Sequence, residues 1–422
     1  MKANLKFVHI TCIIAILTIL CGCMKKGFVA DTYEPDFYEV PKLLPDEVDE
    51  ISPVFLVYGD TQADWRIRND FYRKKNWLTW KMAIFPFYEL YWLHNGISGT
   101  VNRVRMVPDA GEKSRKFMRE TIYRLAGDSK IDFILNVGDM CANDGRRPEH
   151  WETFLRENKH EIPLLTEIPY LPVIGNHERH NDKTFGERNY NAVFDYPPFY
   201  SIDFKDISLF VLDSNILLDW RDEIPNDLQD ELFEKWFVSS DADEPSWLEK
   251  ELMNCENPFR IVAMHHSPLS FGAHWKDWYK DSYGRDTRLK RKALLKLMAD
   301  NGVQVVFSGH EHIYQHNYVP NIPGSESAEA GIHFILSSGG GAPQRDLKSE
   351  RSVRKIQDVY RQEGYTVDLI EEEKVHHYCI VKTENGELSI ETYLVTGDSN
   401  ESDELFEQIR IAPKSEKAHD HY

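Results

Sequence analysis

Side chains that can bind metal ions follow a series of short apolar segments along this chain. The groups are Gly59-Asp60-Thr61-Gln62, Gly138-Asp139, Gly175-Asn176-His177-Glu178, His265-His266-Ser267-Pro268 and Gly309-His310-Glu311-His312. Asp, Asn, Gln and His supply oxygen and nitrogen ligands without a thiolate, a set that suits divalent Mn, Fe or Zn. A single Gly-Asp pair after a strand is common, so the prediction of a metal site depends on finding all of these groups in series.

The spacing also predicts how the groups would share their metal ions. His310 and His312 are two residues apart, so in an extended segment both imidazoles would face the same side. A glycine precedes most of the groups, and we expect it to let the backbone turn sharply. Two divalent ions about 3.5 to 4 Å apart usually share a bridging carboxylate, and Asp139, central in the series, is our candidate.

The elements that must position these residues alternate between buried strands and amphipathic helices. Helices are indicated at 112–126, at 289–299 and after the capping box Ser246-Trp247-Leu248-Glu249, and Asn385-Gly386 indicates a hairpin. This alternation predicts an α/β fold, whose sites lie at the carboxyl ends of strands. The strands are expected at 54–58, 131–137, 170–174, 260–264, 303–307 and 333–336.

Composition excludes several classes of protein. The 422 residues carry 50 Lys and Arg against 69 Asp and Glu, a formal charge of −19, which disfavours a general nucleic-acid binder. With 41% hydrophobic residues the chain has enough apolar surface for a large core. Past the amino-terminal region the cysteines are Cys141, Cys255 and Cys379, which are widely spaced and expected to be buried packing residues.

The first residues are typical of an export signal. Lys2 and Lys6 precede the apolar run 7–20, which is short for a membrane span. The following Leu20-Cys21-Gly22-Cys23 resembles the lipobox of bacterial lipoproteins, with Cys23 as the lipidated residue and an uncleaved signal anchor as the alternative. We therefore expect a signal peptide at 1–22, a tether at 23–52, a catalytic domain at 53–398 and a frayed polar tail at 399–422. Met24, in place of an aspartate, favours the outer membrane or cell surface.

The series of metal-binding groups resembles the calcineurin-like metallophosphoesterases, the family that includes the purple acid phosphatases. Its pattern of D-x-[H/Q], G-D, G-N-H-[E/D], H-x-P and G-H-x-H occurs here in order across residues 59 to 312. The resemblance implies two mixed β-sheets packed as a sandwich with helices outside. It also implies a pair of divalent metal ions of unknown identity (Mn, Fe or Zn) that activate water to hydrolyse a phosphate ester.

The resemblance assigns a role to each matching residue. Asp139 would bridge two ions, and His177 would act as general acid or as donor to the phosphoryl oxygen. Neighbours in a strand face opposite ways, and we favour His266 over His265 because Pro268 completes H-x-P. Asn176 and His274 would also contact substrate. The ligands of the first ion would be Asp60, Gln62, Asp139 and His312, and those of the second Asp139, Asn176, His266 and His310.

Two departures from the family pattern bear on the metals. Gln62 stands where histidine is more usual, and an uncharged amide oxygen would hold the first ion less tightly. Ala142 stands where purple acid phosphatases carry a tyrosine, so we expect a divalent pair and no strong preference for Fe(III). Gly339-Gly340-Gly341 lacks the helix that a phosphate-binding P-loop needs, and we expect only a turn near the site.

Three points stay open at this level. The substrate could be a small phosphomonoester, or a nucleotide or phospholipid cleaved as a diphosphate or diester. The chain could instead be a surface binding lipoprotein that has lost activity. An insertion at 64–110 combines seven aromatic residues between Trp77 and Trp92 with eight basic residues against four acidic ones. This composition suits either a lid over the substrate or contact with lipid headgroups.

Overall fold

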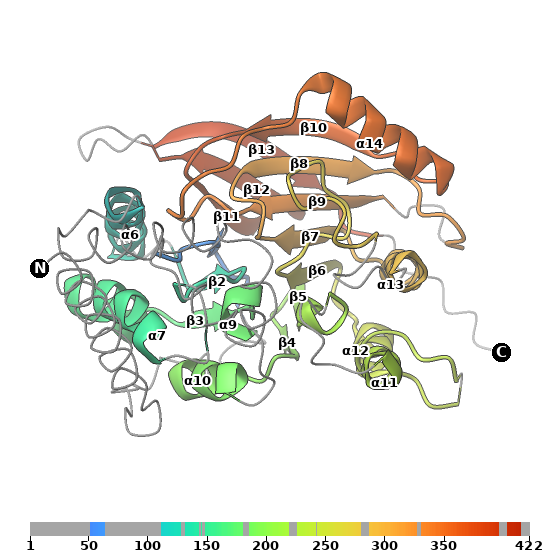
Figure 1. Ribbon diagram of the computed structural model, residues 1–422, viewed down its shortest axis with the longest axis horizontal. Helices are drawn as coiled ribbons and strands as arrows, with labels where there is room; N and C mark the ends of the chain where they lie inside the picture. The colour runs from blue at the N-terminus through green and yellow to red at the C-terminus, as the bar shows by residue number, and fades with distance from the viewer. Residues whose placement is uncertain are drawn as a thin grey trace, which may run out of the picture. The chain divides into compact units, whose positions relative to one another are not determined.

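Two mixed β-sheets form the centre of the fold in the computed structural model (Figure 1). The described residues are 51–63, 111–127, 131–142, 145, 148–179, 185–218, 226–241, 243–279, 287–326, 331–395 and 403–414. The six-stranded sheet has the order β13 (Glu404–Ile411), β12 (Glu387–Leu394), β11 (His377–Glu384), β1 (Phe55–Tyr58), β2 (Phe133–Asn136) and β3 (Tyr170–Pro172). The seven-stranded sheet has the order β10 (Asp368–Glu373), β8 (Tyr314–Val319), β9 (Ile332–Ser337), β7 (Val305–Ser308), β6 (Phe259–Met264), β5 (Ile207–Leu212) and β4 (Tyr200–Asp203).

The two sheets pack face to face through one apolar core. Phe55 and Phe133 of the first sheet stack with ring centroids 4.6 Å apart, and they share a cluster with Leu209 and Ile261 of the second sheet. All four side chains are almost fully buried. Because β1, β2, β5, β6 and β7 are covered on both faces, they are nearly continuous apolar runs without alternating polar residues.

Helices cover the outer faces of both sheets. A second apolar cluster joins the seven-stranded sheet to α11 (Asn226–Trp236), α12 (Trp247–Asn254), α13 (Arg288–Asp300) and α14 (Glu350–Gln362). On the other sheet, Tyr170 of β3 contacts Phe154 of α7 (Pro148–Leu155) and Phe194 of α10 (Phe185–Phe194). Nearby, α6 (Glu112–Gly127) is joined to a π-helical turn at Arg156–Glu161 by the buried pair of Arg115 and Glu157. The expected two-sheet sandwich with helices outside is thus confirmed.

Most of the predicted elements are present with small shifts at their ends. The six predicted strands correspond to β1, β2, β3, β6, β7 and β9, and the predicted helix at 112–126 is α6. Ser246 and Glu249 form the reciprocal capping box at the start of α12. Asn385 and Gly386 both have positive φ and join β11 to β12 as a tight hairpin. Cys141 and Cys379 are buried and Cys255 packs against the core.

The expectation of a frayed tail from residue 399 is wrong for part of that segment. Residues 404–411 form β13, which pairs with β12 along most of its length. Ile409 and Ile411 enter the core between the sheets, while Glu404 and Leu405 remain exposed. Alternation with charged residues concealed this edge strand, because only one of its faces is covered.

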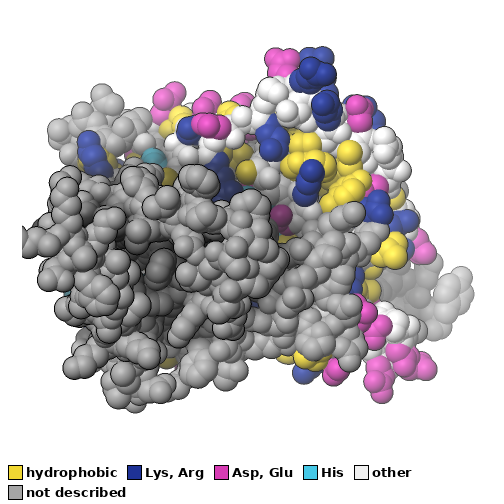
Figure 2. All heavy atoms as spheres, in the orientation of Figure 1, with side chains coloured by type: hydrophobic (Ala, Val, Ile, Leu, Met, Phe, Trp, Pro, Cys, Tyr) yellow, Lys and Arg dark blue, Asp and Glu magenta, His cyan; other side chains and the backbone are white. Residues whose placement is uncertain are grey.

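Several expectations concern segments outside the described residues. The signal peptide, Cys23, the tether up to residue 50 and the insertion at 64–110 all lie there. Within the described segments, no helix is both long and apolar enough to span a bilayer. Figure 2 shows acidic and basic side chains interspersed over the described part of one face, so the net negative charge does not collect into a single patch on that face.

Candidate metal centre

The loops that follow five strands bring the predicted ligands to one edge of the sandwich. Strands β1, β2 and β3 are parallel to one another, as are β6 and β7, so their carboxyl ends lie at common sheet edges. The two edges meet where Gly340 and Ala342, after β9, donate their backbone N–H groups to the carbonyls of Gly59 and Asp60, after β1. Gly340 belongs to the turn expected at 339–341, which therefore lies beside the site.

Four of the predicted ligands have a left-handed backbone. Asp60 and Asp139 have φ of 57°, His310 of 74° and His312 of 54°. Such conformations cost about 1 to 3 kcal/mol each in residues other than glycine and persist only where the surrounding structure imposes them. These four residues cluster at the ends of β1, β2 and β7. This indicates that the local backbone strain serves to direct their side chains into the site.

The glycines before the ligands have a different role from the one expected. Among them only Gly138 has a positive φ, of 100°. The others allow close packing: a Cβ on Gly59 would lie 2.4 Å from Val137 Cγ2, one on Gly175 2.4 Å from Asp139 N, and one on Gly309 2.7 Å from Asp60 Oδ2. The ligand residues make the turns themselves, and the glycines let the loops approach one another.

The first set of predicted ligands is assembled. Asp60 Oδ1 lies 3.3 Å from His312 Nε2, and the amide nitrogen of Gln62 lies 3.1 Å from that same ring nitrogen and 3.5 Å from Asp139 Oδ2. One ligand atom from each of Asp60, Asp139 and His312 lies within 4.8 Å of the other two. His312 is oriented by the carbonyl of Pro343, 2.8 Å from its Nδ1.

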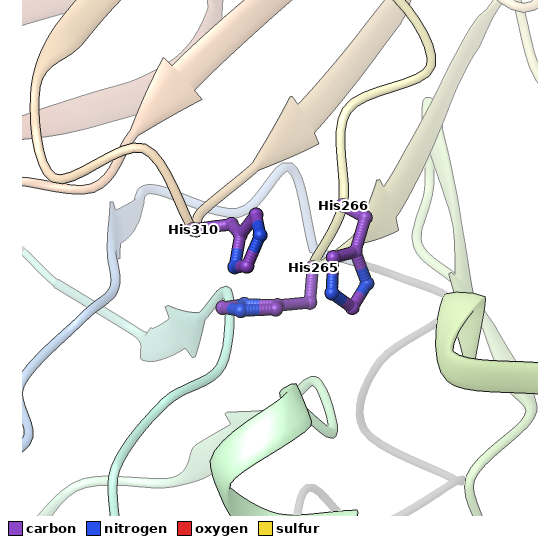
Figure 3. A group of neighbouring side chains, drawn as sticks. All are labelled: His265, His266 and His310. Carbon is purple, nitrogen blue, oxygen red and sulfur yellow. The ribbon is translucent and has the colours of Figure 1, made fainter. Parts of the chain in front are cut away.

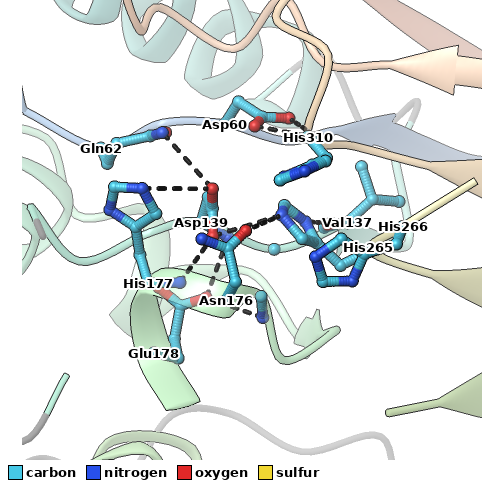
Figure 4. Close-up of polar contacts among 12 residues, drawn as sticks. Asp60, Gln62, Val137, Asp139, Asn176, His177, Glu178, His265, His266 and His310 are labelled. Atoms are coloured by element: carbon cyan, nitrogen blue, oxygen red, sulfur yellow. Dashed lines mark hydrogen bonds and ion pairs between the residues drawn. The ribbon is translucent and has the colours of Figure 1, made fainter. Parts of the chain in front are cut away.

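The second set is assembled around His265, whereas the sequence favoured His266. His265 Nε2 lies 3.3 Å from Asp139 Oδ1 and 3.1 Å from Asn176 Oδ1, and its Nδ1 lies 2.8 Å from the carbonyl of Val137 (Figure 4). This carbonyl fixes the tautomer and leaves Nε2 directed at the bridging candidate. The two neighbouring rings leave the strand in different directions (Figure 3), and His265, His266 and His310 together form one group of possible metal ligands.

His266 leaves the same strand end with its ring turned in another direction (Figure 3). Its Nδ1 lies 2.8 Å from Ser214 Oγ, on the loop after β5. The ring centroid is nevertheless 4.4 Å from that of His310, and His265, His266 and His310 form one buried group of possible ligands. The structure therefore brings both neighbouring histidines close to the site, with His265 nearer to Asp139.

His310 links the centre to a neighbouring pair of side chains. Its backbone N–H donates to Asp60, and its Nε2 lies 3.0 Å from Asp277 Oδ2. The same carboxylate oxygen lies 3.3 Å from Nδ1 of His274, whose ring is 4.0 Å from that of His310. His274 therefore lies close to the centre, beside the proposed ligand His310.

His177 lies on the solvent side of Asp139. Its backbone N–H donates to Asp139 Oδ1 at 2.9 Å, and its Nε2 lies 3.7 Å from Asp139 Oδ2. The side chain keeps 25% of its surface exposed, whereas Asp139 keeps 2%. A partly exposed imidazole beside a buried carboxylate can reach a bound substrate without itself being enclosed.

The electrostatics of the centre favour a cation between the carboxylates. Burial opposes ionisation of Asp139, but His177 and His265 lower its pKa well below the usual range. Burial likewise disfavours charge on His265, yet Asp139 and then Asp60 outweigh it and raise the pKa of His265 to about 9. The buried carboxylates therefore attract positive charge to this position, and a bound metal ion would neutralise their negative charge.

The donor set fits a pair of divalent ions. The centre offers oxygen and nitrogen donors without a thiolate, as Mn, Fe(II) or Zn require, and most of them are buried: Asp60, Gln62, Asp139, His265, His266 and His310. Gln62 Oε1 is buried and has no hydrogen-bond partner among the described residues, and it is the atom through which this amide would bind an ion. Asp139 faces both groups, with Oδ2 toward Gln62 and Oδ1 toward His265.

Sequence reasoning gave no role to three residues around the centre. Glu178 accepts backbone N–H groups of the loop that carries Asp139, Asp277 orients His310, and Arg345 contacts His274. Glu178 stood in the G-N-H-E motif and could have been identified there. Asp277 and Arg345 follow no motif, and only the fold brings them near the centre.

Comparison with known proteins identifies the family of the chain. A family model described as calcineurin-like phosphoesterase matches residues 53–314. Tartrate-resistant acid phosphatase type 5 of Rattus norvegicus is 25% identical over 249 residues, which cover 53% of this chain and 64% of the rat protein. A nucleotide pyrophosphatase/phosphodiesterase of Hordeum vulgare is 23% identical over 248 residues, which cover 53% of this chain and 61% of the barley protein.

A solved structure shares the fold. The purple acid phosphatase from seeds of yellow lupin (Lupinus luteus) superposes with a TM-score of 0.54 at 14% sequence identity, covering 89% of this chain and 56% of the lupin chain. The chain thus spans less than two thirds of the length of each of these three proteins.

Proposed function

Because the chain belongs to the calcineurin-like phosphoesterase family, we propose that it hydrolyses phosphate esters at a dinuclear metal centre. The observation that carries the proposal is the position of Asp139, a buried carboxylate that faces Gln62 with one oxygen and His265 with the other. A carboxylate in this position suits a bridge between two ions. We assign Asp60, Gln62, Asp139 and His312 to one ion, and Asp139, Asn176, His265 and His310 to the other, with His266 beside them.

When bound, two divalent ions would neutralise the phosphate charge and lower the pKa of a water molecule to supply the nucleophile. The residues of the chain orient the reactants around them. His177 is partly exposed beside Asp139, and we assign its imidazole to protonate the leaving oxygen or to donate to a phosphoryl oxygen. Asn176 and His274 complete the polar surface that faces substrate.

The test is reconstitution of the purified protein with Mn, Fe or Zn, followed by assays with phosphomonoesters, phosphodiesters and nucleoside diphosphates. We expect about two divalent ions per chain and turnover of at least one ester class, with both lost in Asp139→Asn. Asp358→Asn is a matched control, because Asp358 is an exposed acid on α14 that pairs only with Arg361 among the described residues. Fewer than one ion per chain after reconstitution would instead favour an inactive binding protein.

Cleavage of a diphosphate or diester is the second candidate activity. It is supported by the similarity to the barley nucleotide pyrophosphatase/phosphodiesterase. The same substrate panel separates the two activities: kcat/KM at least about tenfold higher for nucleoside diphosphates or phosphodiesters than for monoesters would select the second.

We also propose that the chain is exported and anchored through a lipid on Cys23, at the outer membrane or the cell surface. The support is the sequence Leu20-Cys21-Gly22-Cys23 after a short apolar run. Substitution of Cys23 by Ser should move the protein from the membrane fraction to the soluble fraction. Mass spectrometry of the wild-type amino terminus should detect a cysteine that is lipidated on both its sulfur and its amine. A membrane-bound Cys23→Ser protein of unchanged mass would refute the anchor and indicate an uncleaved signal.

The insertion at 64–110 is proposed to serve as a lid over the substrate, as a lipid-contacting surface, or as both. It begins two residues after Gln62, a proposed ligand of the first ion. Replacing 69–103 with a short Gly-Ser bridge should change substrate preference if the segment is a lid. It should weaken liposome binding of protein lacking Cys23 if the segment contacts lipid. A folded truncation with neither effect would refute both roles.

A further inference from the structure

Arg345 is held beside the metal centre by the turn that follows β9. Its backbone N–H donates to the carbonyl of His312 at 3.3 Å. Two residues earlier, the carbonyl of Pro343 lies 2.8 Å from Nδ1 of the same histidine. The backbone that carries Arg345 is therefore fixed by two contacts to His312, a proposed metal ligand. A shift of Arg345 would disturb His312, and a shift of His312 would disturb Arg345.

The guanidinium of Arg345 contacts a histidine that lies beside the proposed ligand His310. Its Nη1 contacts Nε2 of His274, and Nδ1 of His274 lies 3.3 Å from Asp277 Oδ2. The same Asp277 oxygen lies 3.0 Å from Nε2 of His310. A guanidinium can only donate, so His274 accepts at Nε2 and donates from Nδ1 to Asp277. This arrangement leads from Arg345 through His274 and Asp277 to a proposed ligand of the second ion.

No carboxylate among the described residues lies within ion-pair distance of Arg345, although the side chain is only partly exposed. The nearby acids have other partners: Asp277 contacts two histidines, and Glu311 accepts from Ser270 Oγ and from the backbone N–H of His274. A partly buried cation that lacks an acidic partner favours binding of an external anion. Its fork of N–H donors matches the terminal oxygens of a phosphate.

From this geometry we propose that Arg345, positioned by His274, binds the phosphate of the substrate and selects esters whose phosphate is a dianion. The inference rests on the proposed phosphoesterase function and names its substrate class: phosphomonoesters, or compounds with a terminal phosphate. A monoester presents three terminal oxygens, enough to contact two metal ions and the guanidinium together. A diester has one terminal oxygen fewer and one negative charge, so it gains less from Arg345.

The test compares Arg345→Ala and Arg345→Lys with wild type in the metal-loaded full chain. The measurements are kcat and KM for p-nitrophenyl phosphate and bis(p-nitrophenyl) phosphate, and calorimetric binding of inorganic phosphate. For Arg345→Ala we expect about a tenfold or greater loss in kcat/KM for the monoester and in phosphate affinity, but less than about a threefold loss for the diester. Lys should restore part of the loss, because it carries the charge without the fork.

Arg361→Ala serves as the matched control, because Arg361 is an exposed arginine on α14 paired with Asp358. It should leave all of these quantities unchanged. Equal losses for both ester classes in Arg345→Ala, unchanged phosphate affinity, or loss of bound metal would overturn the inference. Calorimetry keeps it separate from the proposed function: a wild type that hydrolyses neither ester refutes the function, while phosphate binding that still depends on Arg345 upholds the anion site.

Discussion

Glu178 holds the loop that carries Asp139 through both of its carboxylate oxygens. Oε2 accepts the backbone N–H of Asp139 at 2.9 Å and of Gly175 at 2.8 Å, while Oε1 accepts those of Met140 at 2.7 Å and Cys141 at 2.8 Å. The carboxylate is fully buried. It thereby stabilises the left-handed backbone of Asp139 and joins the ends of β2 and β3 in one rigid unit.

Glu178→Gln should destabilise the protein and reduce metal binding. An amide can accept at only one end, so its NH₂ group would face two backbone N–H donors that lose their acceptor. We expect a loss of about 3 kcal/mol in the free energy of unfolding, measured by urea titration, together with lower metal content. Glu350→Gln, at an exposed acid on α14, is the control and should change neither quantity. Wild-type stability in Glu178→Gln would show that the loop does not depend on this carboxylate.

Asp139→Asn should lose more metal and more activity than Gln62→Ala. The first change weakens a charged ligand shared by two ions, whereas the second removes one neutral donor. We expect kcat to fall by about 100-fold or more for Asp139→Asn and by less for Gln62→Ala, with metal content measured by elemental analysis falling in the same order. Wild-type metal content and turnover in both variants would refute the assignment.

His265→Ala and His266→Ala should separate the roles of the two neighbouring histidines. His265 is directed at Asp139 and Asn176, whereas His266 contacts Ser214. We expect His265→Ala to weaken binding of the second ion by more than about 100-fold and His266→Ala by about 10- to 100-fold, as for a residue next to a ligand. Metal titration of the apo protein provides the measurement. A larger loss of affinity in His266→Ala than in His265→Ala would instead identify His266, which the H-x-P pattern with Pro268 favours, as the ligand.

His177→Ala should keep the metal stoichiometry while lowering kcat by about 10²- to 10⁴-fold for esters with poor leaving groups. Esters with good leaving groups need less protonation and should lose less. Steady-state assays across a series of phenyl phosphates, with metal analysis alongside, provide the measurement. An equal loss across the series would assign His177 to the phosphoryl oxygen, and loss of metal would make it a ligand.

Stability should fall as pH decreases, in part because of His377. Burial lowers the pKa of this ring to about 4, and the ring packs edge-on against Tyr314 at 4.9 Å. An unfolded histidine titrates near pH 6.5, so between about pH 6.5 and 4 the unfolded state binds a proton that the folded state does not, at a cost of up to about 3 kcal/mol. His377→Gln should flatten this part of the stability curve from urea unfolding at pH 7, 6 and 5. An unchanged slope would contradict the prediction.

The alternation of elements in the sequence predicted an α/β fold, the family resemblance supplied the two-sheet sandwich, and the motifs supplied the polar groups that the structure brings to one edge. Buried strands such as β1 and β2 are almost entirely apolar, and polar residues follow them directly in the chain, so the local sequence reveals both the strands and the groups after them. The hairpin at Asn385 and the cap at Ser246 depend on neighbouring residues only and were likewise predictable. Strand β13 was not, because it is covered on one face and its pairing with β12 is set by the sheet.

Only the tertiary structure decided which side chains meet. The choice between His265 and His266 depends on the direction in which β6 ends relative to β2, and a sequence pattern carries no such information. Asp277 reaches His310 from 33 residues away, and Arg345 reaches His274 from 71. Such contacts arise from packing between loops that are distant in the chain. Local propensities therefore specified the elements and the chemistry of the ligands, while the meeting of two sheet edges determined the geometry of the centre.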